Sequence, residues 1–261
     1  MYARHLGLRF FVFGAFVFLL APIVVVVGVS FNPTSALRVP LGDYSLRWYG
    51  KFLATPGFRD ALILVSLPVA IVSSAGATVV GTLAAIGLTR SRYVASSALG
   101  SILMLPLLIP SILLGAALYL VSVAFGSGTN ALTLALGHML LGIPYVIRVV
   151  VAALVAVDPR LEEAARSLGC TPVQAFRRAV LPILRSAILS GAIFAFIVSF
   201  SDINLALFLS GPETTTLPIQ IFSQIFWESD PTIAAASTMQ IVVVGCLILA
   251  MQRLFRIKLG F

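Results

Sequence analysis

Long apolar runs without a single charged residue limit what this sequence can fold into. The first run lies between Arg9 and Arg38. An α-helix crosses the hydrocarbon core of a bilayer in roughly 20 residues, so this run predicts a membrane-spanning helix. Its basic start is shared with signal peptides. However, the run exceeds the roughly 7–15 apolar residues of such a segment, and no A-x-A-like cleavage site closes it. We therefore interpret it as a membrane anchor.

The amino-acid composition supports the same class of protein. Hydrophobic residues make up 60% of the 261 residues and charged residues only 10%, whereas a soluble domain has about 25% charged residues. This excludes a disordered chain, which is polar and highly charged, and disfavours a soluble globule. Cys170 and Cys246 are too few and too isolated to predict a disulfide scaffold or a metal site.

Continuous apolar stretches predict six α-helical spans. The stretch from residue 92 to residue 158 is too long for one helix, and a glycine-containing turn at 126–130 divides it. Strands of a β-barrel would be shorter and would alternate in hydropathy. The predicted fold class is an all-α integral membrane protein, formed as a single domain over residues 1–261. The six expected spans lie near residues 10–30, 61–88, 97–125, 132–156, 187–209 and 232–252.

Lys and Arg are distributed unequally between the two sides of these spans. An even number of spans puts both termini on one side, and that side collects twelve cations against four on the other. The twelve are Arg4, Arg9, Arg90, Arg92, Arg160, Arg166, Arg177, Arg178, Arg185, Arg253, Arg256 and Lys258. The positive-inside rule predicts that both termini are cytoplasmic. It also explains the net charge of +8 without a nucleic-acid partner.

Polar residues inside the expected spans are candidates for a translocation path, because such residues are costly in a bilayer. The candidates are Tyr145, Arg148, Ser199, Asp202 and Asn204. A structural role is the alternative: Arg148 could pair with Asp202 or snorkel, and Asp202 could lie at the outer interface. His138, near the outer end of the fourth span, is interpreted as a packing or capping histidine.

Two further patterns concern helix packing. Small residues recur at four-residue spacing at Ser73, Ala77, Gly81 and Ala85, and such rows let membrane helices approach closely. The row indicates either ordinary packing or a face that moves during gating. Prolines 106 and 110 predict a bend in the third span.

The cytoplasmic connection near residues 158–186 is predicted to have its own secondary structure. Leu161–Leu168 is predicted to form a short helix that Gly169 ends as a left-handed cap. The Thr171-Pro172 pair is typical of the start of a second helix, which we expect to end near Pro182. The pattern predicts a helix–turn–helix hairpin exposed to a partner. A plain interfacial amphipathic helix is the alternative.

This hairpin resembles the EAA loop of permeases in binding-protein-dependent ABC importers. The family pattern is EAA, three residues, Gly, nine residues and I-x-L-P; Glu163, Gly169 and Pro182 stand at matching positions, with Ala179 in place of isoleucine. The resemblance implies a methionine-importer-like permease fold. It also implies that the first hairpin helix is a coupling helix, held in a groove of a separate ATPase. The residues it assigns to coupling are Leu161, Glu162, Glu163, Ala164, Ala165, Leu168 and Gly169.

The same resemblance implies the partners of the chain. They are cytoplasmic ABC ATPase subunits, a second and different permease, an extracytoplasmic binding protein and membrane lipid, with no nucleic acid. The chain carries no G-x-x-x-x-G-K-[ST] motif, so ATP and Mg are expected on the ATPase. We expect no catalytic residue, metal or cofactor in this chain. The expected location is the bacterial inner membrane.

Several short stretches resemble permeases of spermidine/putrescine importers more specifically. They are 44–49, 105–110, His138 with 144–148, 199–202, and 208–212 followed by 216–218. A polyamine or similar cationic amine is therefore the expected substrate. Opines, γ-aminobutyrate, ferric iron, thiamine and phosphonates, which other relatives carry, stay open. A secondary transporter is the remote alternative, and the absence of an evident inverted repeat disfavours it.

Overall fold

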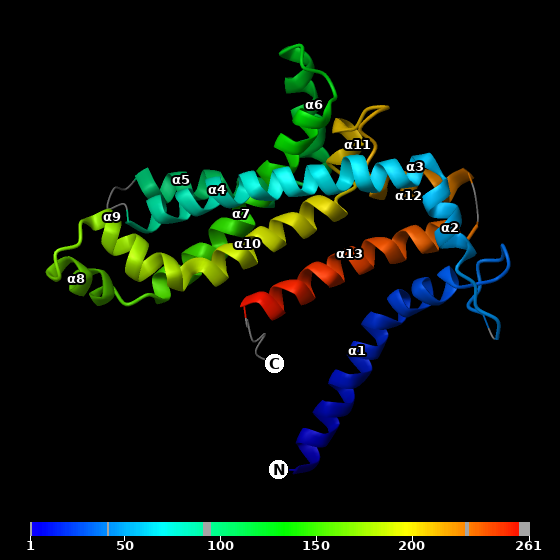
Figure 1. Cartoon of the computed structure of the whole chain (residues 1–261), viewed down its shortest axis with the longest axis horizontal. Coiled ribbons are helices and arrows are strands. Elements are labelled where there is room, and N and C mark those ends of the chain that lie inside the picture. Colours follow the sequence, from blue (N-terminus) through cyan, green and yellow to red (C-terminus); the bar gives the residue numbers. More distant parts are fainter. Residues whose placement is uncertain (1, 41, 91–94, 228–229, 256–261) are drawn as a thin grey trace. The chain divides into compact units, whose positions relative to one another are not determined.

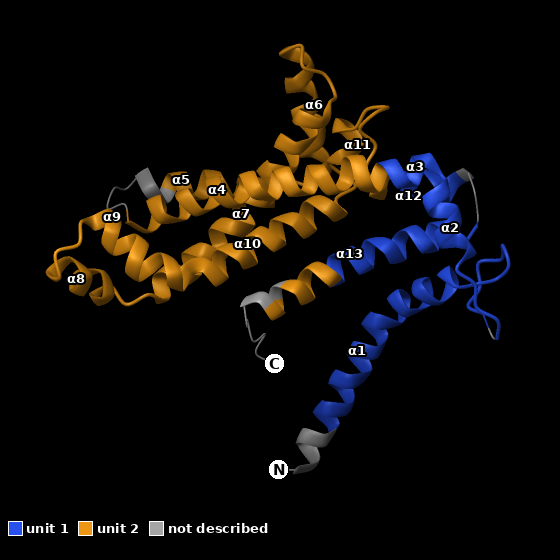
Figure 2. Cartoon of the chain, in the orientation of Figure 1, with its two compact units in different colours: residues 1–60, 220–245 blue, residues 61–219, 246–261 orange. Residues whose placement is uncertain are grey.

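The computed structural model describes residues 2–40, 42–90, 95–227 and 230–255, and the regular secondary structure in these ranges is helical. The chain divides into two compact units (Figure 2). One contains residues 1–60 and 220–245, and the other contains residues 61–219 and 246–261. The second unit holds the predicted hairpin and every candidate site residue.

Membrane-spanning helices account for most of the described chain. Five stretches are long and apolar enough to cross a membrane: Gly7–Ser30, Pro56–Arg90, Ala131–Ala156, Pro172–Ser201 and Thr232–Ala250. A bent pair, α5 (Ala95–Leu108) and α6 (Ser111–Ala124), supplies a sixth candidate. The predicted all-α membrane fold is therefore confirmed.

The third span departs from the expected kinked helix over 97–125. Its two halves meet at 104°. Pro110 precedes the first residue of α6. Proline has no amide hydrogen and disfavours helical backbone at the residue before it, so the helix ends at Leu108 instead of bending through.

Three helices form the core of the second unit: α4 (Leu67–Arg90), α7 (Ala131–Ala156) and α10 (Leu181–Ser201) (Figure 1). Small residues allow their close approach. A Cβ atom on Gly81 would lie 2.8 Å from Cβ of Val146, and one on Gly142 would lie 3.0 Å from Cβ of Ala195. The predicted small-residue row is buried at all of its positions, Ser73, Ala77, Gly81 and Ala85.

Contacts along this core fix the directions of its helices. Gly76 faces Met139 and Gly81 faces Val146, so α4 and α7 run parallel. Gly142 faces Ala195 whereas Gly191 faces Val146, so α10 runs antiparallel to α7. Because α4 ends and α7 begins at opposite ends of the core, the intervening α5–α6 pair carries the chain from one end to the other.

The segment after α10 differs from the predicted span over 187–209. The helix ends at Ser201 and is followed by the short α11 (Ala206–Leu209), which packs against α6 and α7. A further helix, α12 (Leu217–Trp227), was not predicted. Its 11 residues are shorter than the span length on which the prediction depended.

The first unit contains α1 (Tyr2–Ser30), α2 (Arg47–Ala54), α3 (Pro56–Asp60) and most of α13 (Thr232–Phe255). Trp48 and Phe52 of α2 are buried, and Nε1 of Trp48 donates to the carbonyl of Asn32 at 2.6 Å. Lys51 forms an ion pair with Asp230.

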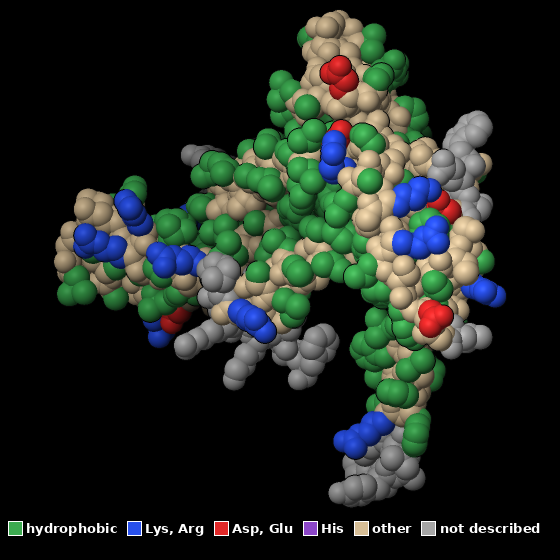
Figure 3. Space-filling model, turned by 45° about the vertical axis from the view of Figure 1, so that its right-hand side comes forward, with side chains coloured by type: hydrophobic (Ala, Val, Ile, Leu, Met, Phe, Trp, Pro, Cys, Tyr) green, Lys and Arg blue, Asp and Glu red, His purple; other side chains and the backbone are tan. Residues whose placement is uncertain are grey.

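Apolar side chains also cover much of the molecular surface (Figure 3). On α1 they include Phe10, Phe11 and Phe18, each at least 70% exposed. An apolar surface of this extent fits a helix that faces lipid or another protein.

Candidate coupling hairpin and translocation path

The predicted hairpin lies between α7 and α10. Its first helix, α8 (Arg160–Ser167), has Glu162 and Glu163 in its first turn. Negative charges at this end of a helix interact favourably with the helix dipole. It ends at Gly169, whose φ of 89° is left-handed. The amide of Cys170 donates to the carbonyl of Ala165 at 3.2 Å, which closes the turn as a Schellman motif. The predicted glycine cap is confirmed.

The second hairpin helix begins as predicted and continues further than predicted. Thr171 and Gln174 form a capping box at the start of α9 (Pro172–Ala175). The π-helical η2 (Phe176–Val180) then joins α9 to α10, so the expected end near Pro182 is wrong. The wider π-helical turn accommodates the proline, which would interrupt an ordinary α-helical hydrogen-bond ladder. The hairpin is therefore a direct extension of a core helix.

Most of the predicted coupling residues lie on the surface of the hairpin. Leu168 is 87% exposed, and Leu161 is also exposed. The remaining outward residues are Glu163, Ala164 and Gly169, while Ala165 is half-buried. No residue of α8 is buried. Exposed leucines and an exposed carboxylate on the same hairpin form a surface that suits a protein partner.

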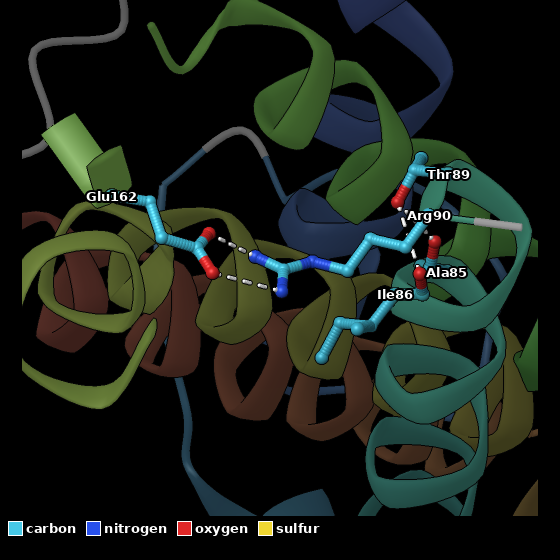
Figure 4. A network of polar contacts seen from close by, with 5 residues as sticks. All are labelled: Ala85, Ile86, Thr89, Arg90 and Glu162. Carbon is cyan, nitrogen blue, oxygen red and sulfur yellow. Dashed lines mark hydrogen bonds and ion pairs between the residues drawn. The ribbon is translucent and has the colours of Figure 1, made fainter. Parts of the chain in front are cut away.

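Glu162 differs from the other coupling residues, because it faces α4. Its carboxylate accepts two hydrogen bonds from Arg90, at 2.6 and 3.3 Å (Figure 4). Arg90 entered the sequence analysis only as a charge at the end of a span. Nothing in the spacing of the two residues indicated this contact, which joins positions 72 residues apart.

Ser199 is one of the candidate path residues, and it is buried in the helix core. Its hydroxyl lies 2.8 Å from Nδ1 of His138 and accepts a hydrogen bond from Ser73 at 2.9 Å. These three residues form a polar trio that joins α4, α7 and α10. His138 is 1% exposed, as expected for a packing histidine.

Asp202 also makes a structural contact. Its Oδ1 accepts hydrogen bonds from the amides of Leu205 at 2.8 Å and Ala206 at 3.3 Å. Leu205 directly precedes α11 and Ala206 is its first residue, so the carboxylate of Asp202 holds the turn that begins α11 in the manner of a helix cap. Asn204, in the same turn, is exposed. The sequence did not indicate this cap, because α11 lies inside a span that was expected to be one continuous helix.

Arg148 and Tyr145 lie on a different part of α7. Arg148 is exposed and Tyr145 is half-buried. Val146, close to Arg148 on α7, faces Gly191 of the antiparallel α10. Measured from Gly191 along the axis of α10, Asp202 lies about 16 Å away, at a rise of 1.5 Å per residue. The pairing of Arg148 with Asp202 therefore does not occur, and the five path candidates do not form one site.

The residues that the structure describes do not form a metal-binding site. Within them, no group of three or more His, Cys, Asp or Glu side chains could hold a metal ion.

Comparison with known proteins places this architecture in a family. Residues 77–259 match the family described as binding-protein-dependent transport system inner membrane component. The chain is 35% identical over 237 residues to the putrescine transport system permease protein PotI of Escherichia coli K12, which covers 88% of this chain and 84% of PotI. It is 30% identical over 253 residues to the spermidine/putrescine transport system permease protein PotC of Haemophilus influenzae, which covers 95% and 98% of the two chains.

Solved structures agree on the fold. A bacterial alginate ABC transporter, in complex with an alginate pentasaccharide-bound periplasmic protein, matches with a TM-score of 0.75 at 15% identity, over 100% of this chain and 96% of that chain. The MetNI methionine ABC transporter matches with a TM-score of 0.64 at 19% identity, over 80% and 96%.

The chain belongs to the family of inner-membrane components of binding-protein-dependent transport systems. It is a multi-pass permease subunit of an ABC importer, as the EAA-type hairpin indicated.

Proposed function

We propose that this permease and a second, different permease form the path for a polyamine, such as putrescine or spermidine. An external binding protein delivers the substrate, and a cytoplasmic ATPase with bound ATP and Mg supplies the energy. The similarity to PotI and PotC over at least 88% of the chain is the observation that supports a polyamine as the substrate. The outer ends of the spans face the binding protein in this proposal, and both termini are cytoplasmic.

The exposed tip of the hairpin supports the ATPase part of the proposal. Leu168 and Val173 are 87% and 75% exposed, which is unfavourable for a surface that stays in water. Glu163, in the first turn of α8, is exposed as well. Together they offer an apolar centre and a charge, and we assign them to the groove of the ATPase.

Uptake by the purified complex tests the substrate. The complex is isolated through a tag on this chain and reconstituted into liposomes with ATP and Mg on the side of the ATPase. The binding protein and radiolabelled putrescine, spermidine or sulfate are supplied on the opposite side. Sulfate is included because the CysT sulfate permease of Salmonella typhimurium is 31% identical over 211 residues. ATP-dependent uptake of a polyamine is expected, and uptake of sulfate without polyamine uptake would contradict the proposal.

Co-purification tests the ATPase contact separately. Glu163→Lys reverses the exposed charge, and Gly169→Arg forces a side chain into a left-handed backbone conformation. Both should reduce the amount of ATPase recovered with the permease. A matched control is Arg160→Lys, which keeps the charge at an exposed position of the same helix. Full recovery of a functioning ATPase with both variants would refute the docking assignment.

A further inference from the structure

The last residue of α4, Arg90, contacts two different parts of the hairpin. Its two terminal nitrogens bind the two carboxylate oxygens of Glu162 on α8. Its guanidinium also lies 4.7 Å from the ring centroid of Phe176 on η2. A bidentate ion pair with a cation–π contact fixes both the direction and the plane of an arginine side chain. Arg90 therefore joins α4 to both arms of the hairpin, and Figure 4 shows its ion pair with Glu162.

The surroundings of Arg90 show why this contact matters for the position of α8. A pocket of about 620 Å³ lies between the ends of α4 and α7 and the hairpin, and Arg90, Asp158, Glu162 and Arg166 are among its lining residues. Helix α8 contacts the second arm of the hairpin, α9 and η2, but none of its residues is fully buried. The side chain of Arg90 adds a contact to this helix from α4.

The other end of this connection is the centre of the bundle. Helix α4 packs against both α7 and α10 through its buried small residues, including Ala77, Gly81 and Ala85. In its last turn, the hydroxyl of Thr89 donates to the carbonyl of Ala85 at 2.8 Å. A displacement of α8 that pulls on Arg90 thus acts on a rigid helix in close contact with its neighbours.

We propose that Arg90 is a positioning residue for energy coupling. Movement of the hairpin reaches the core by two routes: along the continuous α9–η2–α10 helix, and through the pair of Glu162 and Arg90 to α4. Glu162 acts inside the permease by holding Arg90, and it is not a docking residue for the ATPase. This proposal rests on the proposed function, in which an ATPase moves α8.

Charge exchange tests the link in the complete transporter. The variants are Arg90→Glu, Glu162→Arg and the double exchange, with Arg253→Glu as a control that removes an exposed arginine from the last turn of α13. The readout is the ratio of substrate imported to ATP hydrolysed in liposomes, together with the amount of ATPase recovered. A loss of stability alone would lower both rates and leave their ratio unchanged.

We expect each single exchange to lower this ratio about fivefold or more, the lower end of ordinary coupling effects, with ATPase recovery unchanged. The double exchange should restore a large part of it, although Glu at position 90 cannot stack on Phe176. Arg90→Lys should give an intermediate ratio, since it keeps the charge and loses the bidentate geometry.

Other outcomes overturn the proposal. An unchanged ratio in Arg90→Glu, or a double exchange no better than the worse single variant, would show that the link does not carry coupling. Loss of ATPase from Glu162→Arg alone would return Glu162 to the docking surface. Absence of an ATPase from the wild-type complex would instead refute the proposed function, and the role of Arg90 with it.

Discussion

At the scale of single residues, Asp202 has two possible roles that one pair of substitutions separates. A carboxylate that contacts a cationic substrate would lose its effect in Asp202→Asn. A helix cap would not, because Asn caps as well as Asp, whereas Ala costs about 0.5–2 kcal/mol. Since Oδ1 of Asp202 caps α11, we expect near-normal uptake from Asp202→Asn and a lower unfolding temperature from Asp202→Ala. Lost uptake with unchanged stability in the Asn variant would restore the path role.

Ser199 offers a second prediction of the same kind. Its hydroxyl is the shared partner of buried His138 and Ser73, and removing a buried partner costs about 1–3 kcal/mol. Ser199→Ala should therefore lower the unfolding temperature of the detergent-purified complex. Ser186→Ala, at an exposed position of the same helix, is the control and should have no effect. Equal stability of the two variants would contradict a structural role for the trio.

The Lys51–Asp230 ion pair makes a pH-dependent contribution in the first unit. Burial acts to raise the pKa of Asp230, but hydrogen bonds from Lys51 and Thr232 and the charge of Lys51 outweigh it, and the pKa is lowered. A carboxyl with a lowered folded pKa stabilises the fold above its unfolded pKa of about 3.9. That contribution is lost as the pH falls through the lower folded value.

Thermal unfolding as a function of pH checks this expectation. The difference in unfolding temperature between the wild type and Asp230→Asn should be constant near neutral pH and vanish in strong acid. It should also shrink at high salt, because half-exposed charges are screened. A difference that grew as the pH fell would show that the carboxylate destabilises the fold.

At the scale of helices, close packing of the core makes a prediction about two glycines of α4. A Cβ on Gly81 would lie 2.8 Å from Cβ of Val146, whereas one on Gly87 would meet nothing within 4 Å. Overfilling a packed interface costs about 1–3 kcal/mol. Gly81→Ala should therefore destabilise the complex in thermal unfolding and Gly87→Ala should not. A similar loss from both would indicate that helix flexibility, and not packing, decides.

The sequence predicted those features of the helices that depend on neighbouring residues. It did not predict the features that depend on contacts between distant segments. Gly169 and Thr171 mark the hairpin because backbone conformation and capping are local. The small residues of α4 revealed a packing face because lipid-embedded helices need one. The cap by Asp202 and the pair of Arg90 with Glu162 depend on where distant segments meet, and neither spacing nor composition contains that information. The sharp break at Pro110 lies between these cases, since proline predicted a bend but not its size.

At the scale of the whole molecule, the sides on which loops lie follow from a few contacts within each unit. The bond between Arg90 and Glu162 places the end of α4 on the same side as the hairpin. The pair of Lys51 and Asp230 brings α2 together with the residues that precede α13. Both agree with the distribution of cations in the sequence, although Arg92, Arg256 and Lys258 lie outside the described residues.

The α5–α6 pair decides the number of crossings, and with it the side on which each terminus lies. A re-entrant pair would give five crossings and opposite termini, whereas a broken span gives six and termini on one side. Since α4 and α7 run parallel, the pair has to carry the chain across, and we predict six. Reporter fusions after Phe261 and within 126–130 test this: a cytoplasmic fluorescent protein should be active at the first position and an extracytoplasmic phosphatase at the second. Phosphatase activity after Phe261 would contradict a cytoplasmic C-terminus.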